Sequence, residues 1–345
     1  MDYDVLIVGA GPGGLACAKR AAEHGLSTLV VERGRTLGRK VCAGGITWNG
    51  LLKKDYGTLA EKNFPRQQIF SRWQTIEVSA VTPIIATISR VTLAEQMADE
   101  ARTSGAEIRL GQQVTAIAGQ TVSCTSRLTG KRETINGGHL VGADGSSSLV
   151  RRSLGLPVKE WGTGIHYQLP GNLQEMEWHL DGRLFGNGYG WVFPHRHTFS
   201  LGAYADSRTL GAKQLQRNLL AWAHTRGFGS LVKEARTQAE RISFDYRGWR
   251  FGKTFLVGDA AGLASGLTGE GIYSAIISGE AVAETIAHPN HLGDELQQLL
   301  KNHARHRRAV KISGWHPLLT RLLAELTVFA LRSRLIDFRA AEMAR

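Results

Sequence analysis

Long apolar runs, cysteines and acidic residues near the C-terminus are all scarce in this chain of 345 residues. No stretch of about 18 consecutive apolar residues occurs, so no membrane-spanning helix is predicted. A strand-like segment begins almost at the N-terminus, without a basic region and an apolar core before it, so we expect no signal peptide. The three cysteines, Cys17, Cys42 and Cys124, are too few for a disulfide framework and lack the spacing of metal ligands. We therefore expect a protein of the reducing cytoplasm without a metal site.

The composition is that of a globular protein with a basic C-terminal tail. Hydrophobic residues make up 42% and charged residues 21% of the sequence, and the length exceeds that of one typical domain. More than half of the formal net charge of +12 lies from Lys301 onward, where ten basic residues accompany three acidic ones. No nucleic-acid motif accompanies them, so we expect no nucleic-acid partner and rank an anionic lipid surface first.

The N-terminal segment carries a dinucleotide-binding pattern. The apolar run Val5–Val8 predicts a buried parallel strand, and a helix is predicted after the glycines that follow it. Gly9 permits the turn, Gly11 lets backbone N–H groups approach a pyrophosphate, and Gly14 lets the helix pack close to the strand. A second apolar strand ends at Glu32, where an acid accepts hydrogen bonds from an adenosine ribose. The pattern predicts an adenine dinucleotide and leaves FAD and NAD as alternatives.

Three further segments suit contact with the same ligand. The apolar segment from His139 ends at Asp144 in a glycine turn, and a second apolar segment ends at Asp259. Both aspartates fall at carboxyl ends of predicted strands, where α/β sheets bind ligands, although Asp144 equally suits a plain turn. A glycine-rich basic loop from Arg33 to Ile46 can wrap phosphates, or it can be a flexible surface connector. A hairpin-like meander is predicted through Asn136–Gly138, before the buried strand that begins at His139.

The stretch 162–246 changes character. Short alternating segments dominate it up to Tyr204 and predict an antiparallel sheet, with a helix after it near residues 213–225. Within it, Tyr189, Trp191 and Phe193 fall on one face of a predicted strand because side chains alternate with period two. These aromatic rings either wall an apolar substrate channel or fill the core between the two sheets.

The basic tail is predicted to form an amphipathic helix, with or without a kink, over Pro317–Met343. Such a helix fits a membrane surface, and packing against the dinucleotide-binding domain is an equally good interpretation. His303 and His306 share one helix face without a third ligand nearby. We expect them to belong to a solvated basic face rather than to a metal site.

Three segments taken together resemble the FAD-binding fold of the aromatic hydroxylase superfamily: the N-terminal fingerprint, Val141–Gly145 and Gly258–Ala261. Within that superfamily, the segments Lys40–Gly45, Tyr189–Pro194 and Leu267–Ile272 resemble the geranylgeranyl reductase family. The resemblance extends from residue 2 to about residue 285. The histidine and proline that hydroxylases carry after the Gly-Asp motif are absent, and so is the Trp-x-Trp-x-Ile-Pro motif of flavin halogenases.

This resemblance implies an α/β fold with three parts. A Rossmann-like FAD-binding domain is expected from residues 1–50, 90–161 and 247–300. A second, mainly antiparallel β-sheet substrate domain is expected from residues 51–89 and 162–246. Residues 301–345 are expected to form a basic amphipathic helical tail.

The resemblance also places the cofactor contacts. Gly14 falls at the pyrophosphate, Glu32 and Arg33 at the ribose, and Val114 near the adenine through its backbone. With the turn glycines, the expected FAD-binding residues are Gly9, Gly11, Gly14, Glu32, Arg33, Cys42, Ala43, Gly45, Arg90, Val114, Asp259, Gly271 and Ile272.

The implied reaction is the reduction of isolated C=C bonds in an isoprenoid chain, either in a lipid or in a prenyl diphosphate. Reduced FAD would deliver hydride from N5 while the other alkene carbon takes a proton. Cys42 is the expected residue for shaping or protonating the site, with a small packing residue as the alternative, and Tyr189 and Trp191 are expected to line the channel. Cys17 and Cys124 are interpreted as core residues.

Several features stay open at this level. The electron donor is NADPH or a ferredoxin-type reductant, because no second dinucleotide-binding domain is visible in the sequence. An FAD-dependent monooxygenase acting on an aromatic or lipid substrate is the alternative enzyme, and a flavin-binding or lipid-binding protein without turnover is the alternative outside enzymes. A peripheral position at the inner face of the membrane is compatible with the tail. The oligomeric state is not predicted.

Overall fold

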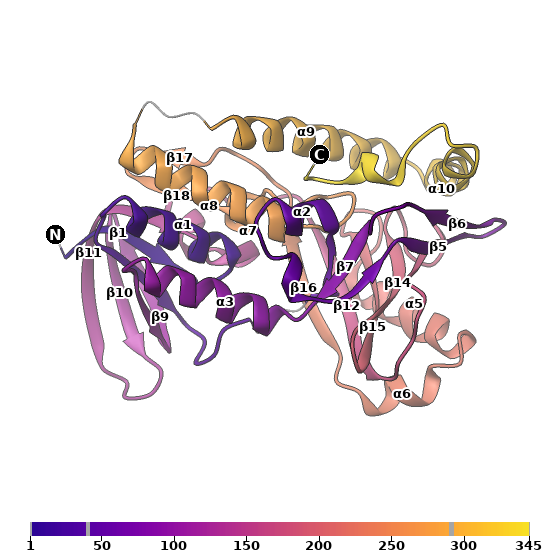
Figure 1. Ribbon diagram of the computed structural model, residues 1–345, viewed down its shortest axis with the longest axis horizontal. Coiled ribbons are helices and arrows are strands. Elements are labelled where there is room, and N and C mark those ends of the chain that lie inside the picture. The colour runs from indigo at the N-terminus through magenta and orange to yellow at the C-terminus, as the bar shows by residue number, and fades with distance from the viewer. Residues whose placement is uncertain (1, 39–41, 290–292, 345) are drawn as a thin grey trace.

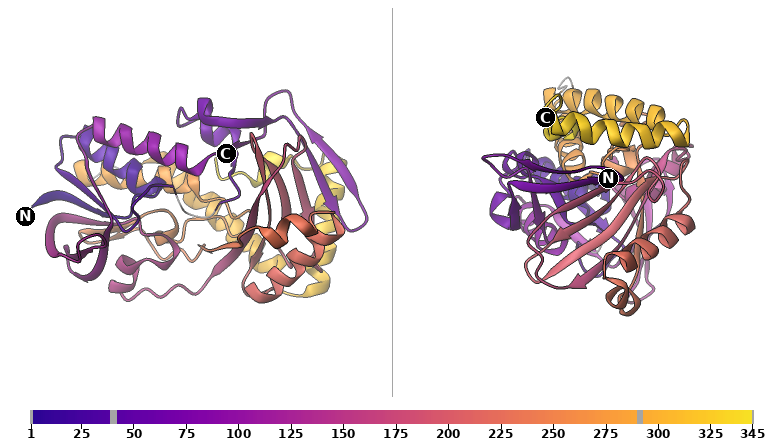
Figure 2. Two further views of the ribbon diagram at one scale, coloured as in Figure 1. Left: turned by 90° about the horizontal axis from the view of Figure 1, so that it is seen from below. Right: turned by 90° about the vertical axis from the view of Figure 1, so that its right-hand side faces the viewer.

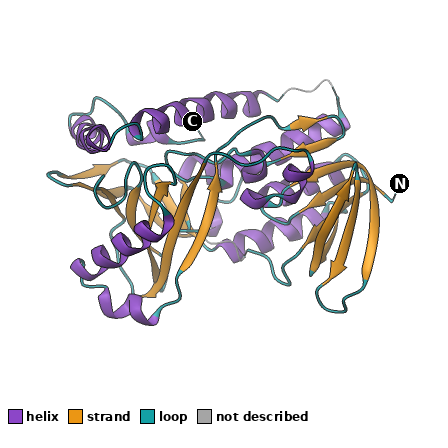
Figure 3. Cartoon of the chain, turned by 180° about the vertical axis from the view of Figure 1, so that it is seen from behind, coloured by secondary structure: helices purple, strands orange, loops and turns teal. Residues whose placement is uncertain are grey.

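The computed structural model describes residues 2–38, 42–289 and 293–344, and it shows two large sheets flanked by helices (Figure 1). Lys40 and Val41 of the predicted cofactor loop lie outside the described residues. Seen from behind, the two sheets stand side by side, with the two tail helices along one end of both (Figure 3). The predicted α/β fold class is confirmed.

The first sheet is mainly parallel and contains the N-terminal fingerprint. Its strand order is β17-β18-β11-β1-β2-β8, in which β1 pairs in parallel with both β2 and β11. The strands are β1 Tyr3–Val8, β2 Thr28–Glu32, β8 Glu107–Leu110, β11 Arg132–Gly142, β17 Arg250–Phe251 and β18 Thr254–Leu256. Three helices cover one face: α1 Pro12–Glu23, α3 Arg90–Thr103 and α8 Ile272–Ala287.

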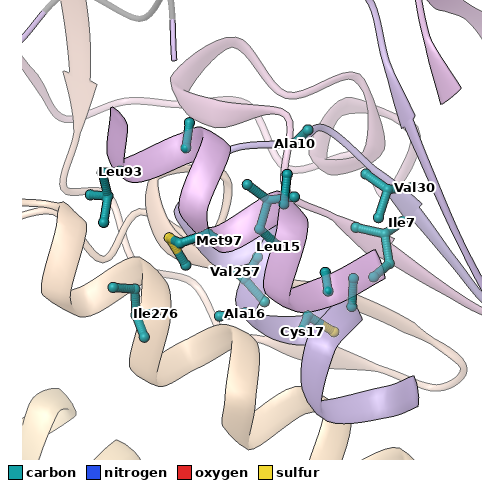
Figure 4. Close-up of a cluster of buried hydrophobic side chains, with 14 of the residues drawn as sticks. Ile7, Ala10, Leu15, Ala16, Cys17, Val30, Leu93, Met97, Val257 and Ile276 are labelled. Carbon is teal, nitrogen blue, oxygen red and sulfur yellow. The ribbon is translucent and has the colours of Figure 1, made fainter. Parts of the chain in front are cut away.

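The core between this sheet and its helices is built from small and branched apolar side chains. Ile7 and Val30 from the strands meet Leu15 of α1, Met97 of α3 and Ile276 of α8 (Figure 4). All five are at most 3% exposed. Because alternate residues of a strand point to opposite faces, the neighbouring strand positions supply a second cluster on the other side of the sheet.

An antiparallel meander covers that second face, and it corrects one prediction. β9 Gln112–Ala118 and β10 Thr121–Ser126 pair with the first half of β11, whose second half pairs in parallel with β1. The predicted hairpin-like meander is present, but Asn136–Gly138 lies inside its continuous last strand, so the separate strand predicted from His139 is wrong. A Cβ atom at Gly137 would lie 2.8 Å from the Cβ atom of Leu6. Glycine is used there for close approach between strands and not for a reversal of the chain.

The second sheet is antiparallel apart from one pair. Its order is β16-β12-β15-β14-β13-β5-β6, and only β13 and β5 run in parallel. The strands are β5 Arg66–Ser71, β6 Thr75–Ser79, β12 Trp161–Pro170, β13 Glu177–Leu180, β14 Tyr189–Pro194, β15 Thr198–Asp206 and β16 Gln238–Ser243. The helices α5 Ala212–Thr225 and α6 Gly229–Glu234 pack on its outer face (Figure 2). Its inner face turns toward the first sheet.

Short elements join the two sheets. A three-stranded sheet consists of β3 Gly45–Thr47, β4 Ala60–Phe64 and β7 Ile85–Ile88, and α2 Trp48–Leu52 follows β3. Two short helices, α4 Leu149–Ser153 and α7 Gly258–Ala261, follow β11 and β18. Ser148 caps α4, since its hydroxyl accepts a hydrogen bond from the amide of Arg151 at 2.8 Å.

The tail forms α9 Asp294–Ser313 and α10 Pro317–Arg332, so the helix predicted over Pro317–Met343 is wrong beyond Arg332. Arg334 adopts a φ of 55°, which reverses the chain. The following segment then buries Met343 and Ala344 against α8 and α9. Burial of the last apolar residues replaces the helix that their periodicity indicated. Among the described residues, no helix combines the length and the hydropathy that a membrane span requires.

Candidate cofactor and substrate site

A cavity of about 830 Å³ lies between the carboxyl edge of the first sheet, the inner face of the second sheet and the tail helices. Ligand sites in proteins commonly measure a few hundred to about 1,000 Å³. One end is lined by Gly11 and Gly13 of the fingerprint and by the Gly258–Asp259 turn, and the other by aromatic side chains of β13 and β14 and by α10.

The fingerprint turn is shaped for close approach. Gly9 has a φ of 104°, and a Cβ atom there would lie 2.5 Å from the carbonyl oxygen of Ala143. A Cβ atom at Gly14 would lie 2.0 Å from the carbonyl oxygen of Gly9. At Gly11, by contrast, the nearest atom is 3.9 Å away, because this residue borders the cavity. α1 starts behind Gly11 with neither a side-chain cap nor an acidic residue in its first turn, so its first N–H groups are available to an anion.

The predicted ribose and adenine residues lie along the adjoining edge. The Glu32 carboxylate accepts hydrogen bonds from the amides of Ala10 at 2.9 Å and Gly34 at 2.7 Å, which fixes it beside the turn. The Arg33 side chain is exposed. Val114 is half-buried in β9 and lies outside the cavity lining. These residues flank the cavity rather than line it.

Arg90 provides the clearest sign of an anionic ligand. It is the first residue of α3 and lines the cavity. Its Nε and Nη1 atoms are buried and find no hydrogen-bond partner within the described residues. Buried guanidinium donors without a partner are rare in proteins, and phosphate or carbonyl oxygens satisfy them well. The residues at this end therefore fit the diphosphate and ring oxygens of FAD.

The second turn adds another helix N-terminus. α8 begins at Ile272 after Gly271, again without a side-chain cap or an acidic residue in its first turn. Asp259 accepts a hydrogen bond from the Ser146 hydroxyl at 3.0 Å, and a Cβ atom at Gly271 would lie 3.0 Å from its Oδ1. Asp144 has a different role, because its Oδ2 accepts the amide of Leu149 at 2.5 Å and so caps α4. Burial raises the pKa of Asp144.

The loop residues Cys42, Ala43 and Gly45 line the cavity between its two ends. The Gly44 amide donates a hydrogen bond to the Cys42 sulfur at 3.4 Å. A Cβ atom at Gly45 would lie 2.7 Å from the Phe193 ring, so the loop packs directly on β14. The structure thus brings Cys42 and the aromatic strand to one place.

Tyr189, Trp191 and Phe193 all line the cavity from one face of β14, and successive ring centroids lie 5.8 and 5.9 Å apart. The two interpretations of these aromatics therefore describe the same surface, which is both core and cavity wall. Trp178 of β13 was not predicted as a wall residue, and its ring lies 5.1 Å from that of Tyr189 and 4.7 Å from that of Phe193. Only strand pairing, which the sequence does not give, could have placed it.

A buried carboxyl group at the cavity was also missed. Glu270 belongs to the Leu267–Ile272 motif and accepts hydrogen bonds from the Thr47 hydroxyl at 3.2 Å and the Met343 amide at 3.3 Å. Burial raises the pKa of Glu270 to about 7. Its position in a quoted motif was a signal, but the direction of its side chain was not predictable.

The expectation that His303 and His306 are solvated is wrong, because both are buried, at 3% and 6% exposure. His306 lines the cavity, and its Nδ1 lies 2.8 Å from the Ser265 hydroxyl oxygen. Burial lowers the pKa of both imidazoles to about 4. They lie on the inward face of α9, together with the buried Leu299 and Val310.

The described residues contain one other group with metal-ligand chemistry, formed by His24, Glu284 and His288. The Arg20 guanidinium already pairs with the Glu284 carboxylate at 3.2 Å. We assign no metal to this group.

The tail closes the cavity from outside. Thr320, Leu323 and Thr327 of α10 line it. Val328 of the same helix packs on Ile69 and Ile76 of the second sheet, so the predicted packing of this helix against the dinucleotide-binding domain is wrong. The opposite face of α10 leaves an exposed apolar stripe, defined by Leu318, Leu322, Leu326 and Phe329, with exposures of 64%, 55%, 49% and 45%.

The glycine turns, the N-termini of α1 and α8, and Arg90, whose Nε and Nη1 find no partner in the described part of the chain, define a flavoprotein of the FAD-binding α/β class. Residues 2–171 match the family model described as an FAD-binding domain. A digeranylgeranylglycerophospholipid reductase of Methanocella arvoryzae is 29% identical over 316 residues, covering 85% of this chain and 79% of that protein. An uncharacterised protein from the nifH2 5′ region of Methanosarcina barkeri is 35% identical over 171 residues, covering 46% of this chain and 90% of that protein.

The solved structure of a geranylgeranyl bacteriochlorophyll reductase-like protein of Thermoplasma acidophilum shares the fold. Its TM-score is 0.81 at 21% identity, covering 99% of this chain and 95% of that chain. The chain belongs to the geranylgeranyl reductase family of FAD-dependent oxidoreductases.

Proposed function

We propose that this protein is an FAD-dependent reductase that saturates isolated C=C bonds of a geranylgeranyl or related polyprenyl chain. The main observation behind the proposal is the continuous cavity. It extends from the cofactor turns past Cys42 into an apolar channel that is lined by aromatic rings and covered by α10. An extended hydrocarbon chain fits such a channel, because apolar side chains replace the water that it leaves. The name of the Methanocella relative supports a prenylated lipid as substrate.

We assign FAD to the 13 predicted residues, with Arg90 and the N-termini of α1 and α8 as its partners for negative charge. The first sheet with its helices is proposed as the cofactor domain, and the second sheet as the substrate domain. When bound, reduced FAD supplies the hydride for one alkene carbon. The protein positions the alkene beside the cofactor, excludes water and supplies the proton for the other carbon.

The three proposed catalytic residues, Cys42, Tyr189 and Trp191, differ in their hydrogen bonds and therefore in their proposed roles. The Tyr189 hydroxyl donates to the carbonyl of Thr268 at 2.5 Å, and the Trp191 indole N–H donates to the Ser200 hydroxyl at 3.0 Å. Burial raises the pKa of Tyr189, so its phenol keeps its proton. Both side chains therefore orient the substrate with their ring faces. Cys42 lines the cavity, so we assign proton delivery or shaping of the site to its Sγ.

We also propose where in the cell the protein acts and which electron donor reduces its flavin. We assign the exposed apolar stripe of α10, with its arginines, to peripheral contact with the inner membrane surface, where prenylated lipids lie. NADPH or a ferredoxin-type protein is proposed as the donor. Comparing the rates at which each of these reduces the bound flavin would choose between them.

An anaerobic turnover experiment tests the function. The FAD-loaded protein is reduced with dithionite, mixed with geranylgeranyl diphosphate or a geranylgeranylated lipid, and followed by flavin absorbance and product mass. Reoxidation of the flavin with a gain of two hydrogens per bond is expected. A flavin that stays reduced until oxygen is admitted, with oxygen incorporated into the product, would replace the reductase proposal by the monooxygenase.

A further inference from the structure

A buried histidine holds the loop that carries Cys42. His195 follows β14 directly and is 8% exposed. Its Nδ1 lies 2.5 Å from a carboxylate oxygen of Glu61 in β4, and its Nε2 lies 3.1 Å from the carbonyl oxygen of Ala43. The imidazole thus bridges the three-stranded sheet and the cavity loop.

Both partners of this imidazole are hydrogen-bond acceptors in their ordinary states. A neutral imidazole has one N–H donor, whereas a carboxylate and a carbonyl each need one. The two contacts are both hydrogen bonds only when one additional proton is present, on the imidazole or on the carboxyl group. In either arrangement Nε2 carries a proton and donates it to the Ala43 carbonyl.

The same peptide unit reaches Cys42 on its other side. Since the peptide bond is planar and trans, the carbonyl of Ala43 and the amide of Gly44 point in opposite directions. That amide donates to the Cys42 sulfur at 3.4 Å. A hydrogen bond accepted by the carbonyl polarises the peptide and strengthens the N–H as a donor. The four groups form one chain, in the order Glu61, His195, the Ala43–Gly44 peptide and Cys42.

Local packing fixes this geometry. Gly44 has a φ of 78°, and a Cβ atom there would lie 2.3 Å from the His195 ring. The Gly44 carbonyl accepts a hydrogen bond from the amide of Ile88 at 3.0 Å. The imidazole therefore lies flush against the backbone of the loop, and only glycine fits between them.

We propose that Glu61 and His195 form a hydrogen-bond relay that acts through the Ala43–Gly44 peptide to position Cys42 and to stabilise negative charge on its sulfur. His195 is a positioning residue in this relay. The charged or titratable groups that face it are Glu61 from β4 and His166 from β12, which interacts with it electrostatically. Any contribution of the relay to catalysis depends on the proposed catalytic role of Cys42. The effect of the relay on the Cys42 sulfur is independent of that role.

The experiment measures the alkylation of Cys42 by iodoacetamide in the FAD-loaded protein, followed by peptide mass spectrometry across a range of pH. The variants are His195→Gln and Glu61→Gln, and the matched control is His197→Gln, an exposed histidine two residues further on. Cys17 and Cys124 are at most 1% exposed and serve as unreactive internal references.

We expect His195→Gln to slow alkylation near neutral pH by about threefold to tenfold, the value of one hydrogen bond. The plateau rate at high pH should not change, so the whole rate profile moves to higher pH. Glu61→Gln should fall between this variant and the wild type, because a neutral imidazole can still donate from Nε2.

A profile of His195→Gln that coincides with those of the wild type and His197→Gln would overturn the relay. A change in the plateau rate alone would also overturn the relay, because the plateau rate depends only on the access of iodoacetamide to the sulfur. Glu61→Gln gives an independent result if His195→Gln does not bind FAD. No substrate is used, so failure of the reductase proposal would leave this result standing.

Discussion

Single atoms decide most of the chemistry at this site, and Cys42 is the first case. Cys42 lines the cavity between the cofactor turns and the aromatic wall, and serine keeps the size of the side chain but not the polarisable thiol. Cys42→Ser should retain FAD absorbance and lower anaerobic turnover at least about tenfold, the scale of a lost acid–base group. Cys124→Ala, a change in the core, should leave turnover per bound FAD unaltered. Equal turnover in Cys42→Ser and wild type would remove Cys42 from the mechanism.

Glu270 gives the second prediction at this scale. Its folded pKa, raised to about 7 from 4.5 by burial, lies above the unfolded value, so the folded state holds the proton more tightly. This stabilisation is fully present below pH 4.5 and is lost as the pH rises through 7. Glu270→Gln mimics the neutral form, so the variant should gain stability relative to the wild type between pH 5 and pH 8. Urea unfolding at pH 5 and pH 8 measures the free energy of unfolding of both proteins. If the difference between the two proteins is the same at both pH values, folding does not raise the pKa of Glu270.

Residue-level prediction worked where backbone geometry alone dictated the amino acid. Gly9 and Gly14 were assigned their roles from the turn and the packing, and the Cβ distances agree. His303 and His306 show the limit, because charged neighbours on α9 suggested solvent while their own positions face the interior. Which side of a polar helix packs inward depends on the partner surface, and that surface is assembled from segments far apart in the sequence.

At the scale of elements, the N-terminus of α1 separates cofactor binding from folding. A methyl group at Gly11 meets no protein atom closer than 3.9 Å, whereas at Gly14 it would lie 2.0 Å from the Gly9 oxygen. Gly11→Ala should therefore melt like the wild type without FAD but bind FAD at least about tenfold more weakly, because the methyl group occupies the approach of the pyrophosphate. Gly14→Ala should lower the melting temperature even without FAD. Calorimetric titration and thermal unfolding distinguish the two, and wild-type FAD affinity in Gly11→Ala would contradict the assignment.

Element boundaries were predictable where apolar periodicity met a clear stop. β2 ends at Glu32, as predicted for the second apolar strand, and the helix predicted near residues 213–225 is α5. The failures at Asn136–Gly138 and beyond Arg332 have a common cause. In both places tertiary pairing, of β11 with two partners and of Met343 with α8 and α9, overrides the local signal.

At the scale of the whole molecule, the proposed membrane contact rests on the outer face of α10. The stripe of Leu318, Leu322, Leu326 and Phe329 lies on the helix whose other face lines the cavity, so a membrane there would adjoin the lipid channel. The protein should cosediment with vesicles containing phosphatidylglycerol at low salt and only weakly with pure phosphatidylcholine, because the basic tail adds electrostatic attraction. Leu322→Asp with Leu326→Asp should reduce binding at least about tenfold, whereas Leu128→Asp, at a 77% exposed leucine on the β10–β11 turn, should not. If the double variant binds the vesicles as well as Leu128→Asp does, the contact depends on charge alone. If the wild type does not bind the vesicles, the apolar stripe has no role at the membrane.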